Sequence, residues 1–195
     1  MTQLLLIRHA KTDLAGTFCG HSDPDLNAQG WAQVERLIAE LERHPIERVY
    51  TSDLLRAQQT ARSIARHFGV ECHVRAGLRE IHFGRWEGLP WSEIALRDLG
   101  EANRWIKEYP HGNFPDGEDM HCFDTRVRRE IEFLIGESGN KPVAVVTHGG
   151  VIRAVLTQFA QVSPEEAWQR TREHAVPIPI EVPSDIWKPQ IEVPQ

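Results

Sequence analysis

The sequence predicts an α/β protein in which helices pack on a layered sheet of parallel strands. Two apolar runs support this fold class: QLLLI at residues 3–7 and PVAVVT at residues 142–147. Strands buried on both faces of a parallel sheet have this composition, because no alternating position faces water. Each run leads through a polar segment into a helical pattern, and strands that alternate with helices are typical of layered α/β folds.

Further elements follow in order along the first half of the chain. The pattern over residues 28–43 predicts a helix, since apolar side chains recur on one helical face: Trp31, Val34, Leu37, Ile38 and Leu41. A shorter candidate strand, RVYTS at 48–52, precedes a second predicted helix at 53–68. Gly69 stands where that helix should end, because glycine readily adopts the left-handed conformation that closes many helices.

The second half contains predicted helices at 119–135 and 149–160, with a less regular segment before them. Residues 76–118 are rich in Gly, Pro and Trp, and long irregular stretches of this kind often form lids or substrate loops. The tail at 176–195 contains five prolines, so it should be extended and loosely attached. Because no internal repeat or second core pattern is visible, we expect residues 1–195 to form one domain.

Composition and charge limit the possible partners. The formal net charge is −6, whereas general nucleic-acid and membrane-surface binders usually carry a basic surplus. No apolar run is long enough to span a membrane, and residues 1–9 lack the features of a secretory signal. The three cysteines cannot all pair with one another and show no CxxC spacing, which indicates a reducing compartment. We therefore expect a cytoplasmic protein that binds neither nucleic acid nor membranes.

Ten histidines raise the question of a metal site. Most of them have charged or polar neighbours and lack the short His-to-His spacings that metal-binding motifs use. Six are accordingly expected on the surface: His44, His67, His73, His111, His121 and His174. The sequence predicts no metal site.

Basic residues follow the predicted strands. Arg8 and His9 come directly after the first strand, and His148 follows the strand at 142–147. Arg56 lies near the start of the helix that follows RVYTS. The carboxyl ends of parallel strands meet at one edge of a sheet, so these side chains should converge there. Guanidinium groups and a helix N-terminus both favour a phosphate at such a place.

Four segments also carry a resemblance to a known family: LIRHAKT, VYTSDLLRAQQTA, LREIHFGRWEG and VVTHGGVIRAVL. In this order and spacing, over roughly residues 3–160, they resemble the signature segments of the histidine phosphatase superfamily, the phosphoglycerate mutase-like proteins. The resemblance implies a three-layer sandwich with helices on both faces of a mainly parallel sheet. It also implies hydrolysis of a small phosphomonoester through a phosphohistidine, without a metal or another cofactor.

The resemblance implies a role for each matching residue. His9 would be the nucleophile, whose neutral imidazole attacks phosphorus. Glu80 would protonate the departing oxygen and later take a proton from water. The alternative for Glu80 is a surface ion pair with Arg79 or Arg85. If Glu80 is not the acid that protonates the leaving group, the next candidates are His82 and Glu87. The phosphoryl oxygens would be held by Arg8, Arg56 and His148.

The stretch after His9 departs from the family pattern. Where the family usually has Gly-Glu-Thr, this chain has Ala10, Lys11 and Thr12. An asparagine that is common in the family is replaced around Ala15, and the stretch before CGHSD is shorter. Lys11 places a cation near the expected pocket mouth, where it either favours a more anionic substrate or is simply solvated.

Chain length and the segment at 76–118 favour a phosphatase over a phosphoglycerate mutase, since superfamily mutases usually carry larger insertions. FGRWEGLPWSEI is similar to the alpha-ribazole phosphatases, and Trp86 and Trp91 either stack on a flat ring or pack in the core. The predicted substrate is therefore alpha-ribazole 5′-phosphate or a sugar phosphate.

A phosphoprotein-binding module with little turnover is the alternative from another class. His9 together with Glu80 favours turnover, because a binder needs no acid.

Overall fold

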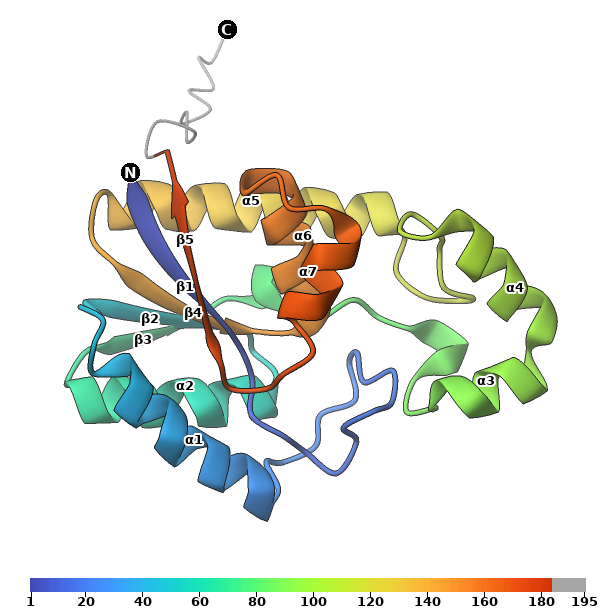
Figure 1. Cartoon of the computed structure of the whole chain (residues 1–195), viewed down its shortest axis with the longest axis horizontal. Helices are drawn as coiled ribbons and strands as arrows, with labels where there is room; N and C mark the ends of the chain where they lie inside the picture. Colours follow the sequence, from blue (N-terminus) through green and yellow to red (C-terminus); the bar gives the residue numbers. More distant parts are fainter. Residues whose placement is uncertain (184–195) are drawn as a thin grey trace, which may run out of the picture.

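Five strands form the central sheet of the computed structural model, which describes residues 1–183 (Figure 1). Their order is β3-β2-β4-β1-β5. The bounds are β1 (Thr2–Arg8), β2 (Arg48–Thr51), β3 (Glu71–Val74), β4 (Val143–Thr147) and β5 (Pro177–Val182). β1 pairs in parallel with β4, β4 with β2, and β2 with β3, whereas β5 pairs antiparallel with β1. The sheet is therefore mainly parallel, as predicted.

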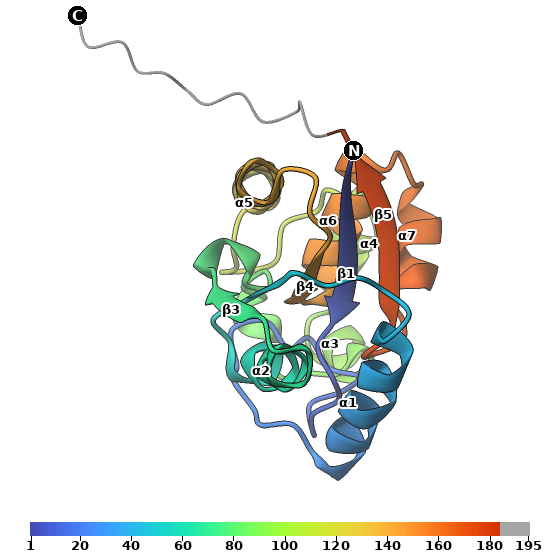
Figure 2. The ribbon, with the colours of Figure 1, turned by 90° about the vertical axis from the view of Figure 1, so that its left-hand side faces the viewer.

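Helices pack on both faces of this sheet (Figures 1 and 2). α1 and α2 cover one face, α5 and α6 cover the other with α7 packed on α6, and α3 and α4 lie beyond the sheet. The bounds are α1 (Ala28–Leu41), α2 (Leu55–Phe68), α3 (Trp91–Arg97), α4 (Leu99–Glu108), α5 (Met120–Ser138), α6 (Gly149–Phe159) and α7 (Pro164–Arg170), with short 3-10 helices η1 (Ala76–Leu78) and η2 (Gly84–Trp86). The three-layer α/β sandwich is thus confirmed.

The apolar run of β1 is explained by its two buried faces. Leu4 and Leu6 lie in the core beneath α5 and α6, whereas Leu5 and Ile7 lie in the core beneath α1 and α2. All four side chains are fully buried. Successive side chains of a strand point to opposite faces, so a strand covered on both sides needs apolar residues at every position.

One prediction for α1 was wrong. Trp31 belonged to the expected core face, but its side chain is 44% exposed. Gly30 is buried instead, because the helix begins with its backbone against Lys11, whose carbonyl oxygen would lie 2.1 Å from a Cβ at Gly30. Asn27 caps this end by accepting a hydrogen bond from the Gly30 N–H at 2.9 Å. This close backbone approach turns the next side chain, Trp31, toward solvent.

The prediction of a loose tail was also wrong for its first part. Residues 177–182 form β5, and Pro177 and Pro179 lie opposite Ile7 and Leu5 of β1. Proline cannot donate to a strand ladder, but β5 is an edge strand and has a neighbour on one side only. The rest of the predicted tail, 184–195, lies outside the described residues.

The segment at 76–118 contains two short helices, α3 and α4, that the sequence did not predict. The prolines of this segment argued against a helix, so α3 was not predicted. Pro90, however, lies immediately before the first turn of α3, where a proline does not interrupt a helix. Both helices lie beyond the sheet (Figure 1), and Trp91 of α3 and Trp105 of α4 line the same cavity as Arg8 and His9. Within residues 1–183, no helix is long and apolar enough to cross a membrane.

Candidate active site

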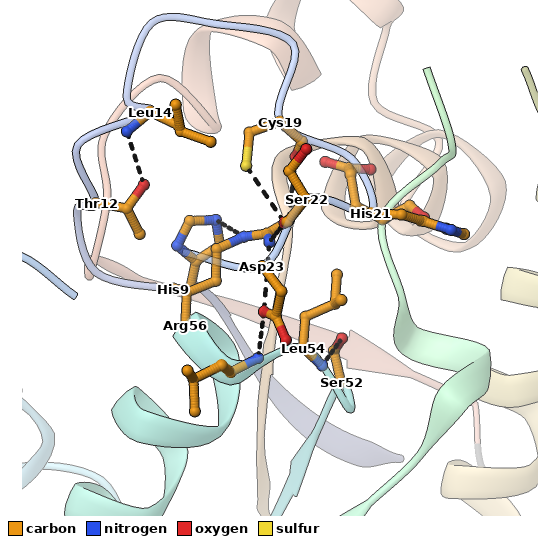
Figure 3. Close-up of polar contacts among 12 residues, drawn as sticks. His9, Thr12, Leu14, Cys19, His21, Ser22, Asp23, Ser52, Leu54 and Arg56 are labelled. Carbon is orange, nitrogen blue, oxygen red and sulfur yellow. Dashed lines mark hydrogen bonds and ion pairs between the residues drawn. The ribbon is translucent and has the colours of Figure 1, made fainter. Parts of the chain in front are cut away.

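The fold brings the predicted basic residues together at the carboxyl edge of the sheet. His9 directly follows β1, and His148 directly follows β4 as the N-cap residue of α6. Their rings have centroids 5.2 Å apart because β1 and β4 are parallel neighbours. Arg56, in the first turn of α2, reaches the same place and lies beside His9 (Figure 3).

The hydrogen bonds of His9 define its tautomer. Its Nδ1 lies 2.8 Å from the carbonyl oxygen of Ala10, which only accepts, so Nδ1 carries the proton. The Nε–H of Arg56 donates to Nε2 of His9 at 3.2 Å. Burial, together with the nearby His148 and Arg56, lowers the pKa of His9 well below its usual value. At neutral pH His9 is therefore an uncharged imidazole whose Nε2 bears the lone pair.

Arg56 is completely buried and uses its guanidinium mainly on the backbone of residues 19–22. Its Nη2 donates to the carbonyl oxygens of Cys19 at 3.1 Å and Gly20 at 2.8 Å, and its Nη1 donates to that of Ser22 at 2.5 Å. The planar fork thus holds a loop on one side and His9 on the other (Figure 3).

His148 lies beneath His9 and is also almost fully buried. Its Nε2 and the Ser52 hydroxyl oxygen are 2.9 Å apart, while its Nδ1 is buried and finds no hydrogen-bond partner in the part of the chain that the structure describes. Burial, together with Arg56 and Arg8, lowers the pKa of His148 well below its usual value. An unpartnered buried nitrogen beside two guanidinium groups is suited to a ligand oxygen.

Arg8 presents a second guanidinium to the site. Its Nη1 donates to the carbonyl oxygen of Thr171 at 2.9 Å, whereas its Nε is buried and has no hydrogen-bond partner within residues 1–183. Burial, followed by the neighbouring Arg153, lowers the pKa of Arg8 to about 10, so it stays charged at neutral pH. The unpaired Nε–H is a donor that a bound anion can use.

Glu80 is buried and does not form the surface ion pair that was its alternative. Its Oε2 accepts from the Gly150 N–H at 2.9 Å and its Oε1 accepts from the Ile81 N–H at 3.0 Å. Arg79 and Arg85 instead pair with aspartates: Asp53 for Arg79, and Asp98 and Asp116 for Arg85. The carboxyl group of Glu80 therefore lies at the N-terminus of α6, close to His148.

His174 is a third imidazole at the site, and its predicted surface position was wrong. It is buried, its ring lies edge-on to His9 with centroids 5.2 Å apart, and its Nδ1 donates to the His9 carbonyl oxygen at 2.9 Å. Burial, followed by the charge of Arg8, lowers the pKa of His174 to about 4. The residue was expected on the surface because its neighbours in the sequence are charged or polar, and its burial depends on the chain segment that leads into β5.

Arg153 was also missed. It lies on α6, and its guanidinium stacks 4.7 Å from the ring centre of Trp168 on α7. Burial lowers its pKa. Its spacing of four residues after Gly149, the first residue of α6, was the available signal, since that interval places both residues on one face of the helix.

A cavity of about 930 Å³ opens above His9. Arg8, His9 and Glu80 line it, while Arg56 and His148 lie beneath its surface with 0% and 1% exposure. Cations at its wall include Lys11, Arg153 and Arg172. Much of the remaining wall is aromatic: Phe18, Phe83, Trp91, Trp105, Tyr109, Phe114 and Phe123. Trp86, one of the two tryptophans considered for stacking, is instead packed in the core beneath this wall.

Within residues 1–183, no group of three or more His, Cys, Asp and Glu side chains is arranged to hold a metal ion. The potential ligands near His9 are the imidazoles of His148 and His174, and Arg8 and Arg56 surround them with positive charge. Such a site favours an anion over a cation.

Comparison with protein families agrees with this geometry. The family model described as histidine phosphatase superfamily (branch 1) matches residues 4–185. The chain belongs to this superfamily. The family resemblance that the sequence motifs indicated is therefore confirmed.

Individual histidine phosphatases cover most of the chain. The adenosylcobalamin/alpha-ribazole phosphatase of Salmonella typhimurium is 29% identical over 168 residues, which make up 85% of this chain and 83% of that protein. Phosphoserine phosphatase 1 of Hydrogenobacter thermophilus is 30% identical over 170 residues, 86% of this chain and 81% of that protein. The crystal structure of alpha-ribazole phosphatase from Shigella flexneri superposes with a TM-score of 0.81 at 27% identity, covering 93% of this chain and 91% of that one. These relatives agree in being phosphatases and differ in the compound they are named for.

Proposed function

We propose that this histidine phosphatase hydrolyses a phosphomonoester through a phosphohistidine formed on Nε2 of His9. The observation that carries the proposal is the state of that nitrogen. Nδ1 holds the proton, the pKa is lowered, and the Nε2 lone pair accepts a hydrogen bond from Arg56, while the charge of Arg8 lies nearby. A neutral imidazole nitrogen beside guanidinium groups is a nucleophile for phosphorus in a site that neutralises phosphoryl oxygens.

In the first step, the Nε2 lone pair of His9 attacks phosphorus while the bond from phosphorus to the ester oxygen breaks. The carboxyl group of Glu80 gives its proton to that oxygen, and an alcohol leaves. In the second step, water attacks phosphorus, the bond from phosphorus to nitrogen breaks, and the Glu80 carboxylate takes a proton from the water. The products are inorganic phosphate, the neutral imidazole of His9 and the protonated carboxyl group of Glu80.

Three residues, Arg8, Arg56 and His148, stabilise the phosphoryl oxygens during both steps. The buried Nε–H of Arg8 has no partner of its own, and the Nε–H of Arg56 points at the nitrogen to which phosphorus becomes attached. Both donors are held in place before substrate arrives, so little reorganisation accompanies the reaction. The unpartnered Nδ1 of His148 supplies a further position for a phosphoryl oxygen or its proton.

The cavity favours a substrate with a bulky organic group. A volume of about 930 Å³ is near the upper end of the usual range for small-molecule pockets, roughly 300–1,000 Å³, and far exceeds what a phosphate alone fills. Its aromatic wall, with the partly exposed Trp91, suits a flat ring. Alpha-ribazole 5′-phosphate, the compound for which two of the similar proteins are named, is therefore our first candidate.

A small phosphate that carries a carboxylate is the second candidate. Lys11 and Arg153 line the cavity, and among residues 1–183 neither pairs with a carboxylate. Cations left over after the phosphoryl group is bound would attract a second anionic group. Phosphoserine, for which another relative is named, has such a group.

The experiment combines turnover with trapping of the intermediate. We expect hydrolysis of p-nitrophenyl phosphate in the presence of EDTA, which a metal-dependent phosphatase or a non-catalytic phosphoprotein-binding module would not show. Quenching in alkaline detergent should trap a phosphoryl group that is stable in alkali and is lost on later treatment with acid, and His9→Ala should abolish both turnover and trapping. Label on a serine or cysteine would contradict the mechanism. The values of kcat/KM for alpha-ribazole 5′-phosphate, phosphoserine and sugar phosphates then decide between the substrate classes.

A further inference from the structure

Glu87, at the end of η2, has a carboxylate that is occupied entirely by hydrogen-bond donors of the chain. Its Oε1 accepts from the backbone N–H of His21 at 2.8 Å and of Phe83 at 3.2 Å. Its Oε2 accepts from the N–H of Gly20 at 3.2 Å and from the N–H and hydroxyl of Ser22 at 3.4 and 2.8 Å. Among the described residues Glu87 pairs with no arginine or lysine, and it does not line the cavity.

The loop at 19–22 is therefore held from two sides. Its N–H groups point to the Glu87 carboxylate, while its carbonyl oxygens accept from the Arg56 guanidinium. The contact with Glu87 is close, because a Cβ at Gly20 would lie 2.2 Å from Oε1 of Glu87. Residues 19–22 thus connect the buried guanidinium of Arg56 with the carboxylate of Glu87, although these two groups do not contact each other.

The same loop also reaches the proposed acid. Nε2 of His21 donates to the backbone carbonyl oxygen of Glu80 at 3.0 Å. Arg126 donates to the same oxygen at 3.1 Å from the other side. Any movement of residues 19–22 would therefore reach both the nucleophile, through Arg56, and the acid, through His21.

We propose that Glu87 is a positioning residue for the phosphoryl transfer: by fixing residues 19–22 it holds Arg56 against His9 and helps to set Glu80. The inference rests on the proposed function for its effect on turnover. Charge-assisted hydrogen bonds from N–H groups to a carboxylate are strong, so one side chain can fix the loop. Burial raises the pKa of Glu87, but its hydrogen bonds with His21, Ser22 and Phe83 outweigh this and lower the pKa below its usual value, so the group is charged at working pH.

Glu87→Gln tests this role with little change in shape. The glutamine keeps one accepting oxygen, but its amide group presents N–H donors to the N–H donors of the loop. We expect kcat for p-nitrophenyl phosphate to fall by about 10–100-fold, as is typical when a residue that orients a functional group is changed. We also expect the inhibition constant of inorganic phosphate to rise and the unfolding transition to remain cooperative. Glu87→Asp, which keeps the charge, should recover part of the loss.

Cys19 gives a readout that does not depend on turnover. It belongs to the loop and lines the cavity, and burial raises the pKa of its thiol, so it should react slowly with a thiol reagent. In a background with Cys72 and Cys122 replaced by serine, Glu87→Gln should make the Cys19 thiol react several-fold faster. Glu93→Gln is the matched control, because Glu93 is another carboxylate of the same chain segment and pairs with Arg97 on the surface of α3.

Each outcome decides the proposal. Unchanged kcat, phosphate inhibition and Cys19 reactivity in Glu87→Gln would overturn it, as would equal effects in Glu93→Gln. If Glu87→Gln does not fold, Ser22→Ala tests the proposal instead, since it removes the hydrogen bond from the Ser22 hydroxyl to Glu87. A faster reaction of the Cys19 thiol in Ser22→Ala supports the positioning role of Glu87, and an unchanged rate overturns it. If the wild type has no phosphatase activity, the proposed function fails, whereas phosphate binding and Cys19 reactivity still test the positioning role.

Discussion

The Nε–H of Arg56 donates to Nε2 of His9 across 3.2 Å, inside a site where both side chains are buried. A permanently charged donor at this nitrogen opposes its protonation, so the nucleophile remains neutral. The same N–H lies where an oxygen of the attached phosphoryl group would need a donor. One guanidinium therefore prepares the nucleophile and supports the intermediate.

The first prediction concerns the geometry of this guanidinium. Arg56→Lys should lower kcat by about 10²–10³-fold, the usual cost of losing one well-placed transition-state donor. Lysine keeps the charge, but one ammonium cannot donate both to His9 and to three loop carbonyl oxygens in a planar fork. The free energy of unfolding should also fall, by about 1–3 kcal/mol, because buried carbonyl oxygens lose their donors.

Steady-state kinetics and urea unfolding measure these two effects. Arg62→Lys is the matched control, since Arg62 lies on the same helix, is exposed and hydrogen-bonds to Gln58 of that helix. Full activity in Arg56→Lys would show that charge at this position suffices and that the fork is not needed.

The second prediction compares two adjacent glycines at the start of α6. A Cβ at Gly150 would lie 2.2 Å from Oε1 of Glu80, whereas a Cβ at Gly149 would first meet the flexible end of Arg153 at 3.2 Å. Gly150→Ala should therefore displace the Glu80 carboxyl group and lower kcat for an alkyl phosphate by at least about 10-fold. Gly149→Ala should have a smaller effect. Alanine suits a helix at both positions, so a lower thermal unfolding temperature in Gly150→Ala than in Gly149→Ala would report the displaced Glu80 rather than a loss of helix propensity. Equal kcat values would mean that Glu80 is not held where the reaction occurs.

The third prediction is a loss of stability in mild acid. His174 has a pKa of about 4 when folded, against a usual value of 6.5 in the unfolded chain. Between these values the unfolded chain takes up a proton that the folded protein does not, so the free energy of unfolding falls as the pH is lowered from about 6.5 toward 4. His9 and His148 act in the same direction, since burial lowers their pKa values too.

His174→Gln isolates one of these contributions. Urea unfolding at pH 7 and pH 5 should show a drop in stability that is smaller than that of the wild type by roughly 2 kcal/mol, at about 1.4 kcal/mol per pH unit below 6.5. Replacement of the exposed His121 by glutamine should leave the drop as in the wild type. An unchanged drop in His174→Gln would mean that this imidazole is protonated in the folded protein.

The residues that sequence reasoning placed well are those tied to the ends of predicted strands. Arg8, His9 and His148 directly follow apolar runs, and parallel strands carry such residues to one edge whatever the details of packing. Glu80 does not follow a predicted strand, and its place in the site was predicted only because LREIHFGRWEG resembles a signature segment of the histidine phosphatase superfamily. The structure brings it to the N-terminus of α6 through the N–H of Gly150.

What the sequence could not reveal depends on contacts between distant segments. His174 reaches His9 because β5 pairs antiparallel with β1, and nothing local to a proline-rich tail indicates that pairing. The apolar pattern that includes Trp31 correctly predicted the helix α1, but Gly30 packs closely against the backbone of Lys11, and the side chain of Trp31 therefore faces solvent. The role of Glu87 likewise appears only when residues 19–22 and 83–87 lie side by side.

The last prediction tests Glu80 as the acid that protonates the leaving oxygen. A general acid matters in proportion to how much the leaving group needs a proton, and such transfer typically contributes about 10²–10⁴-fold. Glu80→Gln should therefore slow phosphohistidine formation strongly from an alkyl phosphate, whose alkoxide is a poor leaving group. It should slow formation from p-nitrophenyl phosphate much less, because nitrophenolate leaves without a proton.

Rapid quenching of both reactions in alkali measures phosphohistidine formation itself, apart from the later attack by water, in which Glu80 takes a proton whichever ester was the substrate. Arg8→Ala is the comparison, because loss of a phosphoryl donor should slow formation from the two esters to similar degrees. Equal slowing in Glu80→Gln would contradict the assignment. His82 would then be the next acid to test, since it lies two residues further along the chain and the carboxylate of Glu87 is already engaged by the backbone of residues 20–22.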